Sequence, residues 1–414
     1  MPMPLIPRIL ELAPELTAWR RDLHAHPETA FQEVRTAALV AERLRQFGCD
    51  AVHTGLARTG VVGVLQAGRS PRRIGLRADM DALHLSEANG FAHRSTDPQR
   101  MHACGHDGHT VMLLGAARYL AETRRFNGTV VLIFQPAEEN EGGGRQMVEE
   151  GLFERFPVDA VYGLHNWPGL AVGRFAIRSG PMMAGCDSLE ILVRGRGCHA
   201  AMPEEGIDPI AAGAALVQAL HTIVSRRVAP SDAAVLSLTQ FHAGDTWNVI
   251  PQEAVLRGSL RYFDPALRNR LHEQIRAMVA GVAAAHGAKA QLRLIEGYPP
   301  TLNRPEQAAA AAAAMAAVVG EAQVERERPP TMGAEDFAYM LQARPGAYGW
   351  IGNGPGEGGC LLHNPRYDFN DAILPIGASY WATLVERELA MTPAAPAAAA
   401  ARPPTPWRAP PGPG

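Results

Sequence analysis

Apolar runs of strand length alternate with longer amphipathic stretches over the first 183 residues. The clearest apolar runs are residues 74–77, 129–134 and 160–164, and each lies next to a segment with helical periodicity. Strands that are apolar throughout are typical of a sheet buried on both faces. The alternation of strands with helices therefore predicts an α/β domain with a mixed, mostly parallel sheet between helices.

The pattern changes between residues 187 and 296. Four strands that alternate apolar with polar residues surround two predicted helices, 208–225 and 266–285, in the order strand, helix, strand, strand, helix, strand. This is the order of a ferredoxin-like α+β unit, which leaves one sheet face and its edges open. We expect an inserted dimerisation or lid domain over residues 184–296.

The α/β pattern resumes after residue 297, with a helix through the alanine run at 308–319, a strand at 347–351 and a final helix at 378–390. The first domain is therefore expected to be discontinuous, comprising residues 1–183 and 297–391. Residues 392–414 are rich in proline and alanine, a composition that predicts a disordered tail.

Composition excludes several classes of function. The 39 basic and 42 acidic residues, with a net charge of -3, are scattered and form no basic stripe, so nucleic acid is not an expected partner. The longest apolar run is too short for a bilayer span, and the amino terminus lacks the pattern of a secretory signal. Five cysteines without a CxxC pair indicate free thiols or ligands rather than disulfides. We expect a cytoplasmic protein without membrane contact.

The densest cluster of reactive side chains is MHACGHDGH, which contains His102, Cys104, His106 and His109 directly before a helical stretch. Thiolate and imidazole at this density are typical of a transition-metal site. The alternative interpretation is a histidine-rich helix cap.

Further polar residues follow the predicted buried strands. Glu138 and Glu139 follow one strand, His165 follows another, and Asp79 and Asp81 follow a third. Open α/β sheets bind ligands at the carboxyl ends of their strands, so these residues predict a metal ligand and a base, whereas a glutamate pair alone is usually a solvated turn. Because neighbouring side chains of an extended segment point to opposite sides, we expect only one of the two glutamates to face the metal squarely.

A last histidine, His363, lies in the glycine-rich segment GGCLLHNPRYDFN. A lone histidine in such a loop is usually structural, and its spacing only suggests a fifth ligand.

Seven motifs in order, RADMDAL, MHACGHDGHT, FQPAEE, GLHNWP, HAAMP, NVIP and GAEDF, make the chain resemble the M20 family of metallo-aminoacylases and carboxypeptidases. The resemblance is to the branch of hippurate and auxin-conjugate hydrolases, and it runs from residue 20 to residue 371. It implies two divalent ions, of zinc, manganese, nickel or cobalt, and a homodimer, with a tetramer as the further assembly. The ligands it implies are Cys104, His106, Glu139, His165 and His363.

The resemblance also implies catalytic roles. Glu138 would be the base, and Asp81 is grouped with the catalytic residues. His199 would reach the partner subunit's active site, while Asn248 and Arg261 would contact a small N-acyl amino acid substrate.

The chain departs from the family in places. Asp79 stands where distant members have a metal-binding histidine, so Cys104 is expected to replace that ligand. Cys198, His84 and Glu204 stand where the branch usually has glycine, proline and histidine, which bears on substrate preference.

The sequence therefore predicts an amidohydrolase that releases a carboxylic acid and an amino acid. A dipeptidase or carboxypeptidase, or an N-acyl-diaminopimelate deacylase, would use the same core. A catalytically silent dimeric metal-binding protein would not need Glu138 beside Glu139.

Overall fold

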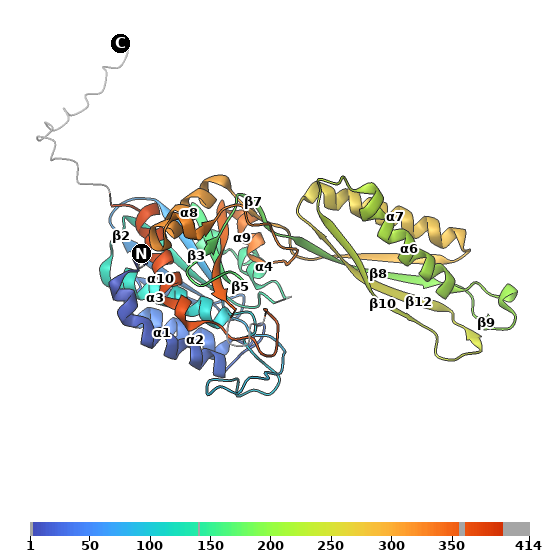
Figure 1. Cartoon of the computed structure of the whole chain (residues 1–414), viewed down its shortest axis with the longest axis horizontal. Helices are drawn as coiled ribbons and strands as arrows, with labels where there is room; N and C mark the ends of the chain where they lie inside the picture. Colours follow the sequence, from blue (N-terminus) through green and yellow to red (C-terminus); the bar gives the residue numbers. More distant parts are fainter. Residues whose placement is uncertain (1–2, 140, 356–360, 392–414) are drawn as a thin grey trace, which may run out of the picture.

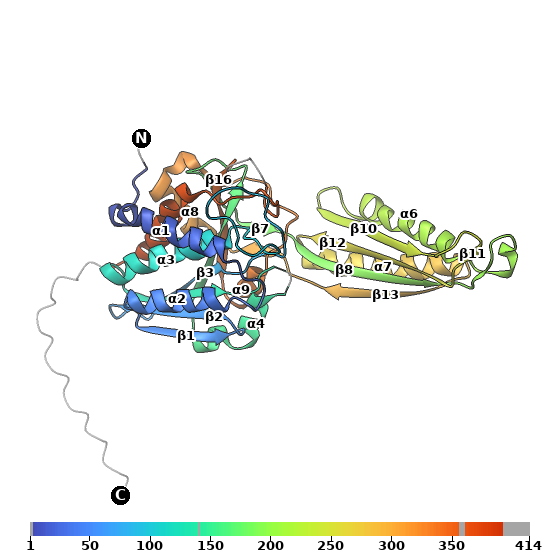
Figure 2. The same cartoon turned by 90° about the horizontal axis from the view of Figure 1, so that it is seen from below.

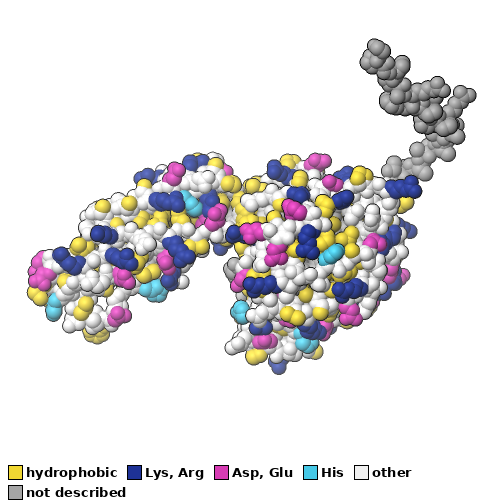
Figure 3. All heavy atoms as spheres, turned by 180° about the vertical axis from the view of Figure 1, so that it is seen from behind, with side chains coloured by type: hydrophobic (Ala, Val, Ile, Leu, Met, Phe, Trp, Pro, Cys, Tyr) yellow, Lys and Arg dark blue, Asp and Glu magenta, His cyan; other side chains and the backbone are white. Residues whose placement is uncertain are grey.

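The computed structural model describes residues 3–139, 141–355 and 361–391. The chain forms a compact body from which a long arm projects (Figure 1, Figure 2). The expected disordered tail, residues 392–414, lies outside the described residues. No described helix is long and apolar enough to cross a bilayer. On the face shown in Figure 3, basic and acidic side chains are interspersed over both body and arm.

The body is built on an eight-stranded sheet with the strand order β1-β2-β4-β3-β5-β16-β6-β15. Its four central strands run parallel to one another: β4 (Gly128–Gln135), β3 (Arg73–Asp79), β5 (Ala160–Pro168) and β16 (Gly346–Gly354). The mostly parallel centre confirms the predicted fold class. On one side, β1 (Ala51–Leu56) and β2 (Gly60–Ala67) extend the sheet with antiparallel pairs that the pattern did not predict. On the other side lie β6 (Phe175–Ala176), antiparallel to β16, and β15 (Val324–Glu325), parallel to β6.

Helices cover both faces of this sheet, as the apolar strands require. One face packs against α1 (Pro7–Ala25), α2 (Val34–Gln46), α3 (His106–Thr123), α8 (Pro305–Val319) and α10 (Leu374–Glu388). The other face packs against α4 (Gly143–Glu149), α5 (Leu152–Arg155) and α9 (Phe337–Ala343). The last helix begins four residues before the predicted 378–390, because Pro375 occupies its first turn, where a missing N–H costs nothing.

The arm has the predicted strand and helix order. It comprises β8 (Gly185–Arg194), α6 (Pro209–Arg227), β10 (Ala234–Ala243), β12 (Glu253–Tyr262), α7 (Pro265–Ala285) and β13 (Lys289–Glu296). Its four strands form an antiparallel sheet in the order β10-β12-β8-β13. Alternate residues of β8 are buried beneath α6 and α7, and these elements form a hydrophobic core of their own.

The arm joins the body where β7 (Gly180–Met183) pairs with β14 (Thr301–Asn303). At its far end, β9 (Cys198–His199) and β11 (Val249–Ile250) form a small two-stranded antiparallel sheet. Figure 1 places β9 at the tip that points away from the body. Among the described residues, no helix covers the second face of the arm sheet. The domain boundaries and a dimerisation role for the arm stay predictions.

Candidate metal centre

The reactive side chains of the body gather at the carboxyl ends of its parallel strands. Asp79 ends β3, and Glu138 and Glu139 lie three and four residues beyond the end of β4. His165 lies within β5, which is longer than predicted, and His106 is the first residue of α3. The parallel arrangement therefore brings together residues that are far apart in the sequence.

Two sets of three possible ligands share one sulfur atom. In the first set, one ligand atom each from Cys104, His106 and His165 lie within 4.8 Å of one another. In the second set, the same holds for Cys104, Glu139 and His363. The five side chains expected to hold metal thus lie together, and only His363 is largely exposed, with 53% of its side chain accessible.

The donor set fits a pair of transition-metal ions. The Cys104 sulfur lies 3.4 Å from His165 Nε2, and His363 Nε2 lies 3.0 Å from Glu139 Oε1. His106 Nε2 is buried and has no hydrogen-bond partner among the described residues. Because buried polar atoms are normally satisfied, this nitrogen is suited to bind a metal, and a mixture of thiolate, imidazole and carboxylate suits borderline metals.

Neighbouring groups orient the candidate ligands. Asp81 lies 3.2 Å from His106 Nδ1 and accepts a hydrogen bond from the Glu139 backbone N–H at 2.9 Å. The His165 Nδ1 lies 2.6 Å from the Asn166 carbonyl oxygen. In both histidines Nδ1 is thus occupied and Nε2 is left for a metal, the arrangement that fixes imidazole ligands in known metal sites.

Asp79 belongs to neither of these two sets of ligands. Its carboxylate lies 2.6 Å from His109 Nδ1, and His109 Nε2 in turn lies 2.7 Å from the Asn166 side chain. His109 and Asp79 therefore form a buried chain that leads to the backbone beside His165. The remaining histidine of the motif, His102, is buried and lies outside both sets.

Burial and charge shift the titration of the ligands. Burial and the carboxylates of Glu139 and Glu138 raise the pKa of the Cys104 thiol well above its usual range. Burial alone would lower the pKa of His106, but Asp79 and Asp81 raise it to about 10. Without metal, both groups therefore hold protons near neutral pH, and a metal has to displace those protons to bind.

Glu138 has the surroundings of a proton carrier. It is 7% exposed, and its Oε1 accepts a hydrogen bond of 3.3 Å from the Asp336 backbone N–H. Burial first, and then the charges of Glu335 and Glu139, raise its pKa well above the usual value for a carboxyl group. A raised pKa lets a carboxyl group both accept and return a proton near neutral pH.

The two adjacent glutamates do not point to opposite sides, and the expectation from strand geometry was wrong. Carboxylate oxygens of Glu138 and Glu139 lie within 4.8 Å of each other and of a His106 nitrogen. The strand ends at Gln135, and Ala137 adopts a left-handed backbone with φ of 54°. This turn breaks the alternation, so that both carboxylates reach the same pocket.

A buried glutamate holds this turn in place. Glu33 Oε1 accepts a hydrogen bond of 2.9 Å from the Ala137 N–H, and its Oε2 accepts one of 2.6 Å from the Thr59 hydroxyl. Left-handed conformations of non-glycine residues are strained and persist only when their surroundings impose them. Glu33 supplies part of that constraint.

A second polar cluster, which was not predicted from the sequence, lies behind the pocket. The buried Arg77 donates hydrogen bonds to Asp79, Glu335 and Asp336 at 2.8, 2.9 and 3.1 Å. Asp336 also accepts a hydrogen bond of 2.7 Å from the Gly144 N–H. An arginine inside an apolar strand and the acid pair of GAEDF were the available signals, because a buried charge needs a partner.

The three remaining predicted residues lie in the arm. His199 and Asn248 are exposed at the small sheet of β9 and β11, where the Ala200 N–H donates to the Asn248 carbonyl. Figure 1 places β9 at the tip of the arm, away from the body that holds the metal ligands. Arg261 lies at the near end of the arm and lines the pocket. This pocket has a volume of about 390 Å³ and is lined by residues that include Cys104, Glu138, Glu139, His165, Trp167, Arg261 and His363.

Comparisons with known proteins agree with this arrangement. Residues 75–387 match the sequence profile of Peptidase family M20/M25/M40. The hippurate hydrolase of Campylobacter jejuni is 43% identical over 387 residues, which are 94% of this chain and 100% of that protein. An N-acyl-L-amino acid amidohydrolase of Geobacillus stearothermophilus is 44% identical over 301 residues, 72% of this chain and 80% of that protein. A crystal structure from Bacillus subtilis, described as a dinuclear metal binding peptidase of the M20 family, matches with a TM-score of 0.80 at 33% identity, and the match covers 92% of this chain and 99% of that one.

Proposed function

The chain belongs to peptidase family M20/M25/M40, and on that basis we propose that it is a metal-dependent amidohydrolase. Its substrates are small N-acyl amino acids, and its products are a carboxylic acid and an amino acid. The observation that carries the proposal is the convergence of two sets of ligands on one cysteine, beside a buried glutamate. Relatives named for hippurate and for N-acyl amino acids support the substrate class.

In this proposal, Cys104, His106 and His165 would hold one divalent ion, and Glu139 and His363 together with Cys104 would hold the other. When bound, the ions lower the pKa of a water molecule and polarise the acyl carbonyl. Zinc, manganese, nickel and cobalt all suit these ligands.

Glu138 acts as the general base. It takes the proton of the attacking water at its carboxylate and later returns this proton to the departing amine. Asp81 does not line the pocket but contacts His106 and the Glu139 backbone. We therefore assign Asp81 a positioning role instead of the catalytic role that the sequence resemblance implies.

The arm supplies the rest of the site. Arg261 fits the carboxylate of the amino acid product, because it is the one arginine among the described residues that line the pocket. His199 and Asn248 act in the pocket of a second copy, where an imidazole N–H stabilises the developing oxyanion. This role requires a homodimer, and the open sheet face of the arm supports one. We also propose that the dimer assembles further into a tetramer and that the protein is cytoplasmic. The four cysteines that the structure describes are free thiols.

Amine release tests the proposal directly. Protein freed of metal with a chelator is loaded with manganese or zinc and then assayed on N-acetyl and N-benzoyl amino acids. We expect activity that depends on metal, with close to two ions per chain. Absence of hydrolysis on every substrate, with metal bound, would overturn the assigned reaction.

A further inference from the structure

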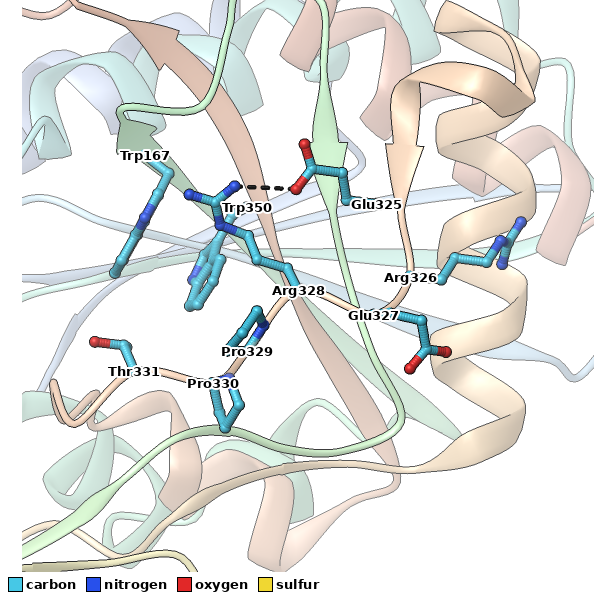
Figure 4. A pocket seen from close by; sticks show the side chains of 9 residues that line it. All are labelled: Trp167, Glu325, Arg326, Glu327, Arg328, Pro329, Pro330, Thr331 and Trp350. Atoms are coloured by element: carbon cyan, nitrogen blue, oxygen red, sulfur yellow. Dashed lines mark hydrogen bonds and ion pairs between the residues drawn. The ribbon is translucent and has the colours of Figure 1, made fainter. Parts of the chain in front are cut away.

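A groove of about 660 Å³ lies beside the metal pocket and takes no part in the proposed chemistry. Trp167, stacked on the buried Trp350, forms one wall, and residues 325–331 form the other (Figure 4). Figure 4 shows that Arg326 and Glu327 point away from the two tryptophans, whereas Arg328 extends towards them, so indole rings, proline rings and the Arg328 side chain line the groove.

Trp167 connects this groove to the metal pocket, because it lines both cavities. Its ring centroid lies 6.2 Å from that of His165, two residues earlier in the chain. A group held at the metal therefore needs to extend only past this one side chain to reach the groove.

The tryptophan wall is rigid. Trp167 stacks on Trp350 with ring centroids 4.0 Å apart and an angle of 13° between the planes. Trp350 is 1% exposed and stands opposite His165 in the pairing of β16 with β5. The half-buried Trp167 thus presents an indole ring whose orientation is fixed before any ligand arrives, which lowers the entropic cost of binding.

The opposite wall is also preformed and carries little net charge. Pro329 and Pro330 restrict the backbone, and Glu325 pairs with Arg328 at 3.0 Å, the contact drawn as a dashed line in Figure 4. A neutral flat group fits such a groove better than a charged one, because aromatic rings pack on indole and proline without losing hydration of a charge.

We infer that this groove, defined by Trp167, Trp350 and residues 325–331, binds the acyl part of the substrate and selects flat aromatic acyl groups. The inference rests on the proposed amidohydrolase function. Arg261 in the arm occupies the pocket wall that suits the amino acid carboxylate, so the acyl end of the same substrate is left for the wall formed by the body, where Trp167 lies.

The test compares two substrates that differ only in the acyl group. We define the aromatic preference as the kcat/KM for N-benzoylglycine divided by that for N-acetylglycine. Trp167→Ala removes the indole wall, and Thr331→Trp fills the groove from the other side. Arg326→Ala is the matched control from the same segment, because its side chain leaves the groove and pairs with Glu321.

We expect the aromatic preference to fall by roughly 10- to 100-fold in Trp167→Ala and in Thr331→Trp, since one aromatic ring loses its packing partner or its space. Arg326→Ala should keep the wild-type ratio. Each variant is first shown to hold as much metal as the wild type, which separates this effect from damage to the metal centre.

The possible outcomes distinguish failure of the proposed function from failure of the groove assignment. If the wild type cleaves neither substrate, the proposed function fails. If it cleaves them and both groove variants keep the aromatic preference within about twofold, the groove assignment is overturned while the function stands. N-acetylphenylalanine is assayed as a third substrate, with the aromatic ring on the amino acid side. If the variants lose activity only towards this substrate, the groove binds the amino acid side chain and the acyl assignment is wrong.

Discussion

Replacing each of the adjacent glutamates with glutamine should disable the site in two different ways. Glutamine keeps the size of the side chain, so Glu138→Gln removes a proton carrier and little else. Its backbone contacts, such as the hydrogen bond of 2.6 Å from the Tyr298 hydroxyl to the Glu138 carbonyl, are unaffected. We expect turnover to fall by roughly 10²- to 10⁴-fold, about 3–5 kcal/mol on the barrier, with metal and substrate still bound.

Stability should respond in the opposite direction from activity in that variant. The pKa of Glu138 is raised in the folded protein, so the charged form opposes folding of the metal-free protein above the ordinary pKa of the group. A neutral amide removes this repulsion from Glu335 and Glu139. The melting temperature of metal-free Glu138→Gln at neutral pH should therefore equal or exceed that of the wild type.

Glu139→Gln should instead weaken metal retention. It removes one of the three ligands of its set, and even the loss of a group that only orients a ligand typically weakens binding by ~10- to 100-fold. Elemental analysis after dialysis, substrate calorimetry and turnover are measured on both variants. Glu149→Gln, an exposed glutamate of α4 that pairs with Arg145, is the control and should match the wild type.

The reasoning would be refuted in either of two ways. If Glu138→Gln loses its metal while Glu139→Gln keeps it, the two roles are reversed. If Glu138→Gln retains full turnover, the general base lies elsewhere.

Three further outcomes follow from the same site. Cys104→Ser should lower the content of both ions, because its sulfur belongs to both ligand sets, whereas His363→Ala should weaken one; equal losses in dialysis would contradict a shared thiolate. Because the pKa values of Cys104 and His106 are raised, metal uptake should release protons and tighten as pH rises from roughly 6 to 8, and titration calorimetry showing constant affinity would disprove it. Inactive His199→Ala chains mixed with inactive Glu138→Ala chains should recover activity through hybrid dimers, and failure despite demonstrated subunit exchange would count against action in the partner's pocket.

The sequence predicted the central strands and the region of the site because both depend on local patterns. Apolar runs identify strands such as β4, and polar residues just past them necessarily meet at one edge of a parallel sheet. The same reasoning located Glu138 and His165 without any long-range information. It gave no signal for β1, whose sequence AVHTGL mixes polar and apolar residues.

Other features depend on contacts that no local pattern specifies. Arg77 and Glu335 are 258 positions apart, so their pairing became visible only in the folded chain. The left-handed turn at Ala137 was equally hidden, because alanine rarely adopts that conformation. Gly143 shows how tight this turn is, since a Cβ there would lie 1.9 Å from the Pro136 carbonyl oxygen.

Because the arm is long, a small change in the angle between arm and body displaces the tip of the arm by a large distance. The ten residues of β8 span about 33 Å at roughly 3.3 Å per residue, and the small sheet that contains His199 lies beyond them. Each degree of rotation where β7 and β14 join arm to body would therefore sweep the tip through about 0.6 Å, on the strand rise just given. A substitution near Pro300 that shifts this angle by ten degrees would displace the tip imidazole by more than the length of a hydrogen bond. If His199 acts in the pocket of a second copy, as proposed above, residues at this junction would influence catalysis although they lie far from the metal ligands.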